Sequence, residues 1–338
     1  MKQKPLIALT RDLPKVELHV HLEGTVDPTF WKSLLKKHQT PEFDLPLAEF
    51  EKRFQYASFD QFLEVFRDII FSFKAADDFY DLTLHYLHNA VTQNIRYCEV
   101  MMTPWFVVQR GIDYQEMMAE IDRAAKEVES EHDIEMKLIL DGPRNFGKDV
   151  VKEVFDMAIQ DQTGRVIAVG LGGDEANYPA EDYVEEFEYA RAHGLQTIAH
   201  AGETAGEQSM LDTINLLKAK RLGHCLGIAK DSELERLIEQ EGVTLDLCPW
   251  SNVNTRVIGS INEHPMYEYL TRGYPITLNS DDPGMFGNSL MQEYETFNNL
   301  YHPSAAQLGT LAKNAVSGSF MSEEKKSKLN REIDDLCN

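Results

Sequence analysis

Short apolar runs alternate along the chain with longer segments in which apolar residues recur at helical spacing. The short runs are typical of buried strands, and the longer segments are typical of amphipathic helices. Helix-like segments such as 115–128 and 183–190 lie between most of the short runs. The sequence predicts strands at residues 16–22, 97–104, 136–142, 166–173, 196–203, 221–225, 243–249 and 275–282.

This alternation predicts an α/β fold of the (β/α)8 TIM-barrel type. Several of the predicted strands are continuous apolar runs, as expected for parallel strands that are covered on both faces. No Pro-, Gly- or Ser-rich linker interrupts the sequence, so we expect one barrel domain over residues 1–338. In such barrels the active site gathers at the carboxyl ends of the strands.

Two segments are expected to add helices to the barrel. The connection at about residues 25–95 is too long for one helix and predicts a helical lid inserted after the first strand. Phe59, Phe62, Leu63 and Phe66 share one helical face there and could line the substrate pocket, although ordinary core packing explains the same spacing. Residues 304–338 are expected to form C-terminal helices that dock on the barrel or on a partner subunit.

The composition is compatible with this predicted fold. The 338 residues are 43% apolar and 26% charged, which is ordinary for a globular protein with a large core. No apolar run approaches the roughly 18 residues of a membrane span, and the amino-terminal segment is a poor signal peptide. The four cysteines form no Cys-x-x-Cys pair and are expected to be free thiols. We therefore expect a cytoplasmic protein without membrane contacts.

The net charge limits the possible partners. A formal charge of −23 repels phosphate backbones, so binding of nucleic acid is disfavoured. A small neutral or cationic substrate fits the charge better. The sequence leaves open whether the protein is a monomer or a homo-oligomer.

Histidine and aspartate residues stand at the carboxyl ends of several predicted strands. Residues two apart in a strand face the same side, so His19 and His21 can point at one ion. His200 and Asp281 close two later strands and complete a set of three imidazoles and one carboxylate. A nitrogen-rich set without thiolates suits a borderline divalent metal such as zinc and leaves room for a water molecule. The sequence therefore predicts a hydrolytic metal site.

Five segments together resemble the adenosine deaminase family of zinc hydrolases. They are residues 14–25, 200–203, 221–224, 248–252 and 280–283, and the resemblance runs from about residue 14 to 320.

The resemblance implies a role for individual residues. One zinc ion per chain would be held by His19, His21, His200 and Asp281 and would activate a water for attack on C6 of a 6-aminopurine. Glu203 would protonate N1 of the ring, and His224 with Asp281 would act on the water. Substrate contacts would come from Asp282 at N7, from the backbone of Gly173 at N3 and from Glu23 near the ribose 5′ end.

The substrate itself is less clearly indicated. Residues 169–175 resemble the nucleoside-deaminating branches, which favours adenosine or deoxyadenosine, converted to inosine or deoxyinosine and ammonia. Glu23 replaces the aspartate of typical adenosine deaminases and is commoner in the adenine branch. Residues 252–256 and 281–286 resemble the branch that deaminates aminodeoxyfutalosine, an adenine nucleoside enlarged at the 5′ position. Both alternatives stay open, as do another metal-dependent amidohydrolase or phosphoesterase and a purine-binding barrel without catalysis.

Two related chemistries are disfavoured. The chain lacks the Pro-Cys-x-x-Cys motif of cytidine-type zinc deaminases, so Cys248 is expected to be a packing residue. The predicted fourth strand carries no lysine of the kind that bridges two metals in related barrels. One metal is therefore expected rather than two.

Overall fold

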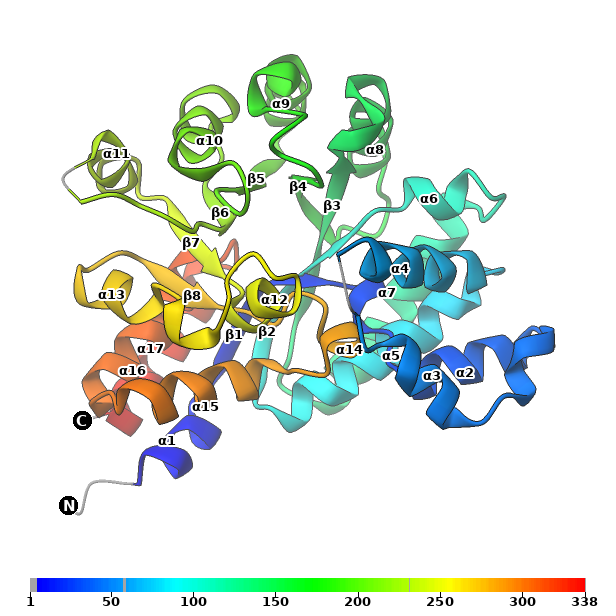
Figure 1. Ribbon diagram of the computed structural model, residues 1–338, viewed down its shortest axis with the longest axis horizontal. Coiled ribbons are helices and arrows are strands. Elements are labelled where there is room, and N and C mark those ends of the chain that lie inside the picture. Colours follow the sequence, from blue (N-terminus) through cyan, green and yellow to red (C-terminus); the bar gives the residue numbers. More distant parts are fainter. Residues whose placement is uncertain (1–4, 57–58, 231, 338) are drawn as a thin grey trace.

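The computed structural model of the protein describes residues 5–56, 59–230 and 232–337. Its strands follow one another in chain order around a single parallel sheet, which confirms the predicted (β/α)8 barrel (Figure 1). The strands are β1 (Lys15–His21), β2 (Ile95–Met102), β3 (Met136–Pro143), β4 (Val166–Gly172), β5 (Gln196–Ala201), β6 (Arg221–His224), β7 (Thr244–Leu247) and β8 (Ile276–Leu278).

The barrel closes between β1 and the segment that follows β8. The backbone N–H of Asp281 donates to the carbonyl of His19 at 3.1 Å, and the N–H of His21 donates to the carbonyl of Asp281 at 2.8 Å. Only residues 276–278 of the predicted strand 275–282 are regular strand. Beyond Leu278, the N–H of Asn279 still donates to the carbonyl of Leu247 at 2.9 Å, and the polar residues 279–282 form the mouth of the barrel.

Helices surround the sheet. Before β1 and between β1 and β2 lie α1 (Leu6–Asp12), η1 (Glu23–Thr25), α2 (Pro28–Lys37), η2 (Pro41–Asp44), α3 (Leu47–Arg53), α4 (Phe59–Ser72) and α5 (Asp77–Thr92). From β2 to β5 follow α6 (Trp105–Val108), α7 (Tyr114–Glu131), η3 (Arg144–Phe146), α8 (Lys148–Ile159), η4 (Ala180–Tyr183) and α9 (Val184–Ala192).

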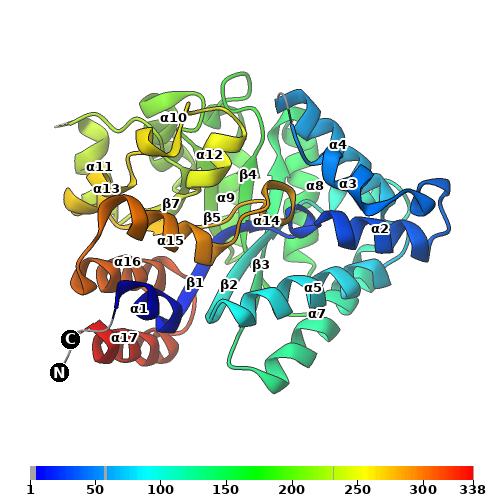
Figure 2. The same cartoon turned by 60° about the horizontal axis from the view of Figure 1, so that its bottom comes forward.

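The second half of the barrel has the same arrangement. Here follow α10 (Gly206–Asp212), η5 (Thr213–Leu217), α11 (Glu233–Glu241), α12 (Pro249–Asn254), η6 (Ile261–Glu263) and α13 (Met266–Thr271). The chain then ends with α14 (Pro283–Phe286), α15 (Leu290–Tyr301), α16 (Ala305–Gly318) and α17 (Glu323–Cys337). The last helix docks on the barrel: α17 lies beside α16 and buries Leu329 and Ile333 (Figure 2).

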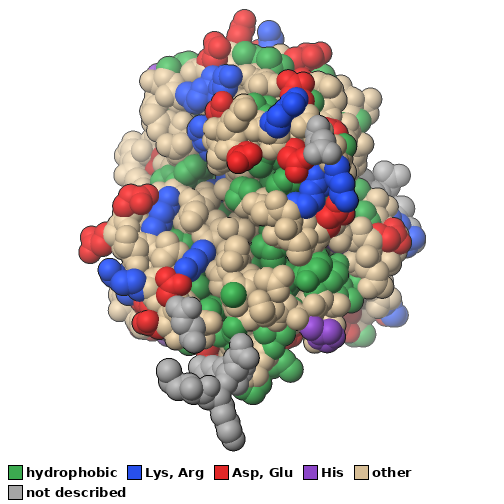
Figure 3. Space-filling view, turned by 90° about the vertical axis from the view of Figure 1, so that its left-hand side faces the viewer, with side chains coloured by type: hydrophobic (Ala, Val, Ile, Leu, Met, Phe, Trp, Pro, Cys, Tyr) green, Lys and Arg blue, Asp and Glu red, His purple; other side chains and the backbone are tan. Residues whose placement is uncertain are grey.

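The core has two parts because the strands bury both faces. A small cluster of Met101, Ile139, Ala168 and Ile198 fills the barrel interior, and a larger cluster lies between strands and helices. The continuous apolar runs of the sequence are explained by this double burial. On the outer surface, Figure 3 shows acidic and basic side chains interspersed over one face of the molecule. Within the described residues, no helix is both long and apolar enough to cross a membrane.

The inserted helices carry the residues that we expected to line the pocket. Phe62 is buried and stacks on Phe286 of α14 with ring centroids 5.1 Å apart, and Phe66 is half-buried. Leu63 is 46% exposed, so it does not share their buried face. The side chain of Phe59 lies outside the described residues. A contact of these residues with substrate stays a prediction.

Candidate active site

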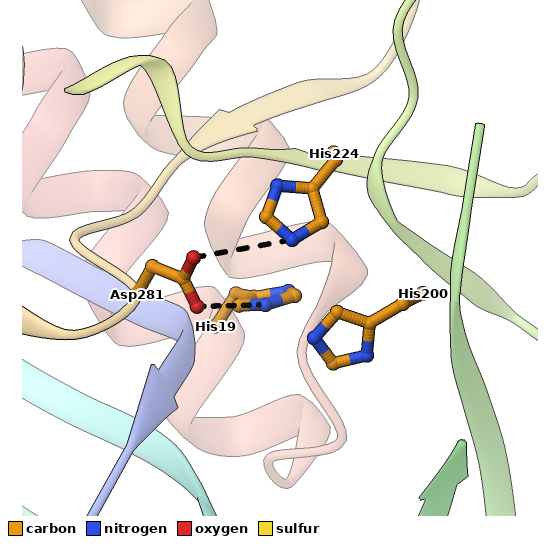
Figure 4. Close-up of side chains that lie close together, drawn as sticks. All are labelled: His19, His200, His224 and Asp281. Carbon is orange, nitrogen blue, oxygen red and sulfur yellow. Dashed lines mark ion pairs between the residues drawn. The ribbon is translucent and has the colours of Figure 1, made fainter. Parts of the chain in front are cut away.

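Three imidazoles and one carboxylate converge at the mouth of the barrel. Potential ligand atoms of His19, His200, His224 and Asp281 all lie within 4.8 Å of one another (Figure 4). His19 is buried, and neither of its ring nitrogens makes a hydrogen bond. The Nε2 of His19 lies 3.4 Å from Oδ1 of Asp281, and a buried imidazole whose nitrogens make no hydrogen bond is costly unless an ion occupies the space between these side chains. The cluster therefore fits a metal, as the sequence predicts.

His21 belongs to the same cluster, although it is absent from that group of four. Its Nε2 lies 3.3 Å from Nε2 of His200 and 3.4 Å from Oδ1 of Asp281. The register of β1 against β2 is irregular between Glu17 and Val20, which is where His19 lies. Five side chains thus face one point, one more than the sequence predicted as ligands.

Burial keeps the imidazoles of His19, His21 and His200 neutral. Burial lowers the pKa of His19 to about 4 and also lowers the pKa of His21 and of His200. Burial alone would raise the pKa of Asp281, but the His19 ring, whose Nε2 is 3.4 Å away, and the other imidazoles nearby hold it well below its ordinary value. Neutral imidazoles and an ionised carboxylate are the states that bind a divalent metal.

Arg144 and Asn252 orient two of these imidazoles. Buried Arg144 donates from Nη2 to the carbonyl oxygens of His200, at 2.8 Å, and Leu171, at 3.2 Å. The Nδ1 of His200 lies 3.2 Å from the same Leu171 oxygen, which fixes Nδ1 as the donor and leaves Nε2 free. The side-chain amide of Asn252 lies 3.1 Å from Nδ1 of His224. Of the two, the sequence analysis missed Arg144, whose position at the end of a predicted strand was an available signal.

Glu203 lies in the loop after β5, beside the cluster. Its Oε2 is 3.8 Å from Nε2 of His224, and burial raises the pKa of its carboxyl group. The carboxylate of Glu175 holds this loop. It accepts hydrogen bonds from the backbone N–H groups of Gly202 at 2.9 Å, Thr204, and Ala205 at 2.8 Å, and from the hydroxyl of Ser209 at 2.7 Å. The backbone on both sides of Glu203 is thereby fixed.

The predicted substrate-binding residues surround the cluster. Asp282 is buried, its Oδ1 has no hydrogen-bond partner, and burial together with Asp281 raises the pKa of its carboxyl group. Glu23 is buried, accepts a hydrogen bond from the N–H of Thr103 at 2.9 Å, and has its pKa raised by burial to about 7. Gly173 has φ +103°, and a Cβ there would lie 2.2 Å from Oδ1 of Asn145, so only glycine fits beside this side chain.

Two residues of the cluster have left-handed backbone conformations. His224 has φ +70° and Asp281 has φ +64°. Such values cost non-glycine residues about 1–3 kcal/mol each, and they concentrate at functional sites. No sequence pattern indicates them.

A further buried carboxylate was missed by the sequence analysis. Asp141 lies at the carboxyl end of β3, and its Oδ1 has no hydrogen-bond partner. A Cβ at Gly170 or Gly172 of β4 would lie 2.3 Å or 2.2 Å from its oxygens, so these glycines make room for it. Burial raises the pKa of Asp141 to about 7. An acidic residue near the end of a predicted strand was the available signal.

Known proteins are similar to this chain over nearly its whole length. A family model described as adenosine deaminase matches residues 14–336. An aminodeoxyfutalosine deaminase of Streptomyces avermitilis is 33% identical, over 95% of this chain and 90% of its own length. An adenine deaminase of Hahella chejuensis is 30% identical, over 96% of this chain and 97% of its own. The crystal structure of adenine deaminase from Arthrobacter aurescens superposes with a TM-score of 0.89 at 27% identity, covering 96% of this chain and 98% of that one.

Proposed function

The chain belongs to the adenosine deaminase family, and we propose that it hydrolyses the 6-amino group of an adenine nucleoside enlarged at its 5′ end, as in aminodeoxyfutalosine. The main support for hydrolytic deamination is one observation. The side chains of His19, His200, His224 and Asp281 converge beside Glu203. Adenosine or deoxyadenosine, the substrate expected first from the sequence, receives less support, because the relatives described above are named for aminodeoxyfutalosine and adenine.

The donor set suits one zinc ion per chain. His19, His21, His200 and Asp281 would hold it, since imidazole and carboxylate are ligands that zinc prefers. When bound there, zinc supplies an activated water at neutral pH. The hydrogen bond from His200 Nδ1 to Leu171 orients one ligand, and the twofold contact of Asp281 with His19 orients another.

Glu203 is the proposed proton donor. Because burial raises its pKa, Glu203 can reach the reaction protonated and give its proton to N1 of the purine. Protonation of N1 withdraws electrons from C6 and makes that carbon open to attack. Glu175 holds the loop of Glu203, so the carboxyl group is positioned before the substrate arrives.

The remaining polar groups of the site hold the attacking water and the ring. His224, oriented by Asn252, would take the proton of the attacking water, and Asp281 lies 3.9 Å from the same imidazole. Asp282, kept protonated by its raised pKa, would donate to N7, and the backbone of Gly173 would donate to N3. The proton taken up by His224 would pass to the amino group, which leaves C6 as ammonia, and the proton of the new C6 hydroxyl would restore Glu203 as the 6-oxopurine forms.

Adenine is the second candidate substrate. By resemblance to this family, Glu23 occupies the position that contacts the 5′ end of the ribose. Glutamate at this position is typical of the adenine branch. The relative from Hahella chejuensis is named an adenine deaminase. The glycine-rich run 170–173 favours a nucleoside instead, so we place adenine second.

A substrate panel tests this proposal. Metal-loaded protein is incubated separately with aminodeoxyfutalosine, adenosine, deoxyadenosine and adenine, and ammonia release is recorded with the ultraviolet change from 6-amino to 6-oxopurine. We expect turnover of aminodeoxyfutalosine. This turnover should disappear when a chelator removes the metal and return when zinc is added back. If none of the four compounds is converted by protein that binds zinc, the purine assignment is wrong.

A further inference from the structure

A buried carboxylate inside the barrel lies next to the candidate metal site, and the reaction proposed above gives it no role. This is Asp141 on β3, whose Oδ1 has no hydrogen-bond partner. A buried carboxylate in this state costs free energy unless another charge compensates it. The surroundings of Asp141 indicate which charge that is.

The position of Asp141 follows from the alternation of side chains along the strands. Ile139 on β3 and Ile198 on β5 belong to the apolar cluster inside the barrel. Residues two apart in a strand face the same side, so Asp141 and His200 also point into the barrel, one layer nearer to the carboxyl ends of the strands. The carboxylate therefore shares a layer with a proposed zinc ligand.

Two glycines of β4, the strand between β3 and β5, leave the space between Asp141 and His200 free of side chains. A Cβ at Gly170 would lie 2.3 Å from Oδ1 of Asp141. A Cβ at Gly172 would lie 2.2 Å from Oδ2 of Asp141 and 3.4 Å from Cε1 of the His200 ring. The carboxylate and the imidazole thus approach the same point from two sides.

Arg144 is a buried cation that acts on Asp141, but it does not bind this carboxylate in the way that a paired cation would. Its guanidinium donates to backbone carbonyl oxygens, including that of His200 at 2.8 Å. Burial raises the pKa of the Asp141 carboxyl group, Arg144 lowers it, and the carboxylates of Glu23 and Asp281 raise it further. Asp141 and Asp281 therefore repel each other, and a divalent cation beside them would attract both.

We propose that the charge of Asp141 strengthens the binding of a divalent metal ion by His19, His21, His200 and Asp281, from a position outside the ligand set. This inference rests on the proposed function, because it takes those four residues as the ligands. Asp141 is not among the side chains whose potential ligand atoms lie within 4.8 Å of one another. Its charge can still act on the ion, because attraction through a buried region is weakened less than attraction through water.

The affinity for zinc tests this assignment. The Kd is measured by competition with a chelator in the wild type and in Asp141→Asn, which keeps the shape of the side chain and removes its charge. We expect the Kd to rise by about 10- to 100-fold, with the zinc content at saturation unchanged. Glu186→Gln is the matched control, because Glu186 is also buried with an unpartnered oxygen but lies on the outer helix α9. Its Kd should equal that of the wild type.

The same titration separates the inference from the proposed function. Equal Kd values in the wild type and in Asp141→Asn overturn the role of Asp141 and leave the metal site intact. A wild type that binds no zinc overturns the metal site itself, and the role of Asp141 with it.

The visible spectrum of the cobalt-loaded protein distinguishes a nearby charge from a ligand. Cobalt(II) binds to the same types of donor as zinc, and its absorption bands depend on the ligands around the ion. These bands should keep their positions in Asp141→Asn. Shifted bands would mean that the ligand set has changed and would contradict a position of Asp141 outside it.

Moving the carboxylate to the neighbouring strand provides a rescue experiment. Because a Cβ at Gly170 would lie so close to Oδ1 of Asp141, a side chain there reaches the same space once Asp141 is shortened. Asp141→Ala should weaken zinc binding, and the double variant Asp141→Ala/Gly170→Asp should restore most of the affinity. A double variant that folds, as judged by circular dichroism, but binds zinc as weakly as Asp141→Ala contradicts an effect of charge.

Discussion

Asp281 contacts His19 through both its backbone and its side chain. Its N–H donates to the His19 carbonyl at 3.1 Å, and its Oδ1 lies 3.4 Å from Nε2 of the His19 ring. The first of these contacts is also part of the closure of the barrel between β1 and the segment after β8. Folding of the barrel therefore brings the proposed ligands together before any ion binds.

Loss of either residue should remove the metal. His19→Ala and Asp281→Ala are expected to bind less than about a tenth of the zinc bound by the wild type, since both would be ligands. Metal content is measured by atomic emission after dialysis against buffered zinc. The control is His132→Ala, because His132 is exposed and lies beyond α7. Stoichiometric zinc in either variant would exclude that residue from the ligand set.

Replacement of Glu203 should separate turnover from metal binding. Glu203→Gln keeps the shape of the side chain and removes the proton that we assign to N1, so kcat should fall by about 10²–10⁴-fold with zinc content unchanged. Turnover is followed by ammonia release under saturating substrate. Activity close to that of the wild type would show that another group protonates the ring.

Glu175 is expected to act through Glu203 and not on the substrate. Glu175→Gln replaces one acceptor oxygen by an amide, so it should lose part of its contacts with Gly202, Thr204 and Ala205 and loosen the loop. We expect kcat to fall by about ten-fold or more while KM changes little, because substrate contacts stay in place. A change confined to KM would contradict this positioning role.

The sequence predicted those features that a short stretch of the chain already shows. The proximity of His19, His21 and Asp281 was predicted because each stands at the end of an apolar run. The eight strands were predicted because double burial requires continuous apolar residues. Arg144 and Glu175 were missed because their partners lie 27 to 56 positions away, at His200 and in the Glu203 loop. Such contacts exist only after neighbouring strands have paired.

Two smaller differences have local causes. The predicted helical face of Phe62 and Phe66 also included Leu63, which is 46% exposed. Adjacent residues on a helix are about 100° apart, so a face that includes both Phe62 and Leu63 is wide, and only part of it is buried. The predicted last strand was too long because regular strand ends at Leu278, and Asp281 beyond it has φ +64° and keeps only an isolated bridge to Val20 of β1. A left-handed residue cannot be recognised from apolar patterning.

A buried carboxyl group outside the site should give the protein a pH-dependent stability. Glu293 is buried, and burial raises its pKa to about 8. A raised pKa means that the folded state keeps a proton that the unfolded state releases, so stability from this group is lost as pH rises from its unfolded pKa, about 4.3, to about 8. Glu293→Gln keeps the acceptor for Asn288 and cannot ionise.

The melting temperature of Glu293→Gln, relative to that of the wild type, should therefore rise between about pH 5 and pH 8. Differential scanning calorimetry at several pH values measures it. Glu268→Gln, an exposed carboxylate on α13, is the control for a general charge effect. A difference that stays constant with pH would contradict the raised pKa.

The specificity constants for aminodeoxyfutalosine and adenosine, measured on the same zinc-loaded preparation by ammonia release, test the proposed substrate. We expect aminodeoxyfutalosine to be deaminated with the larger kcat/KM, by about ten-fold or more if its 5′ group is bound. Equal or larger kcat/KM for adenosine would contradict the assignment of an enlarged 5′ end, and conversion of neither nucleoside would contradict the assignment of the purine ring.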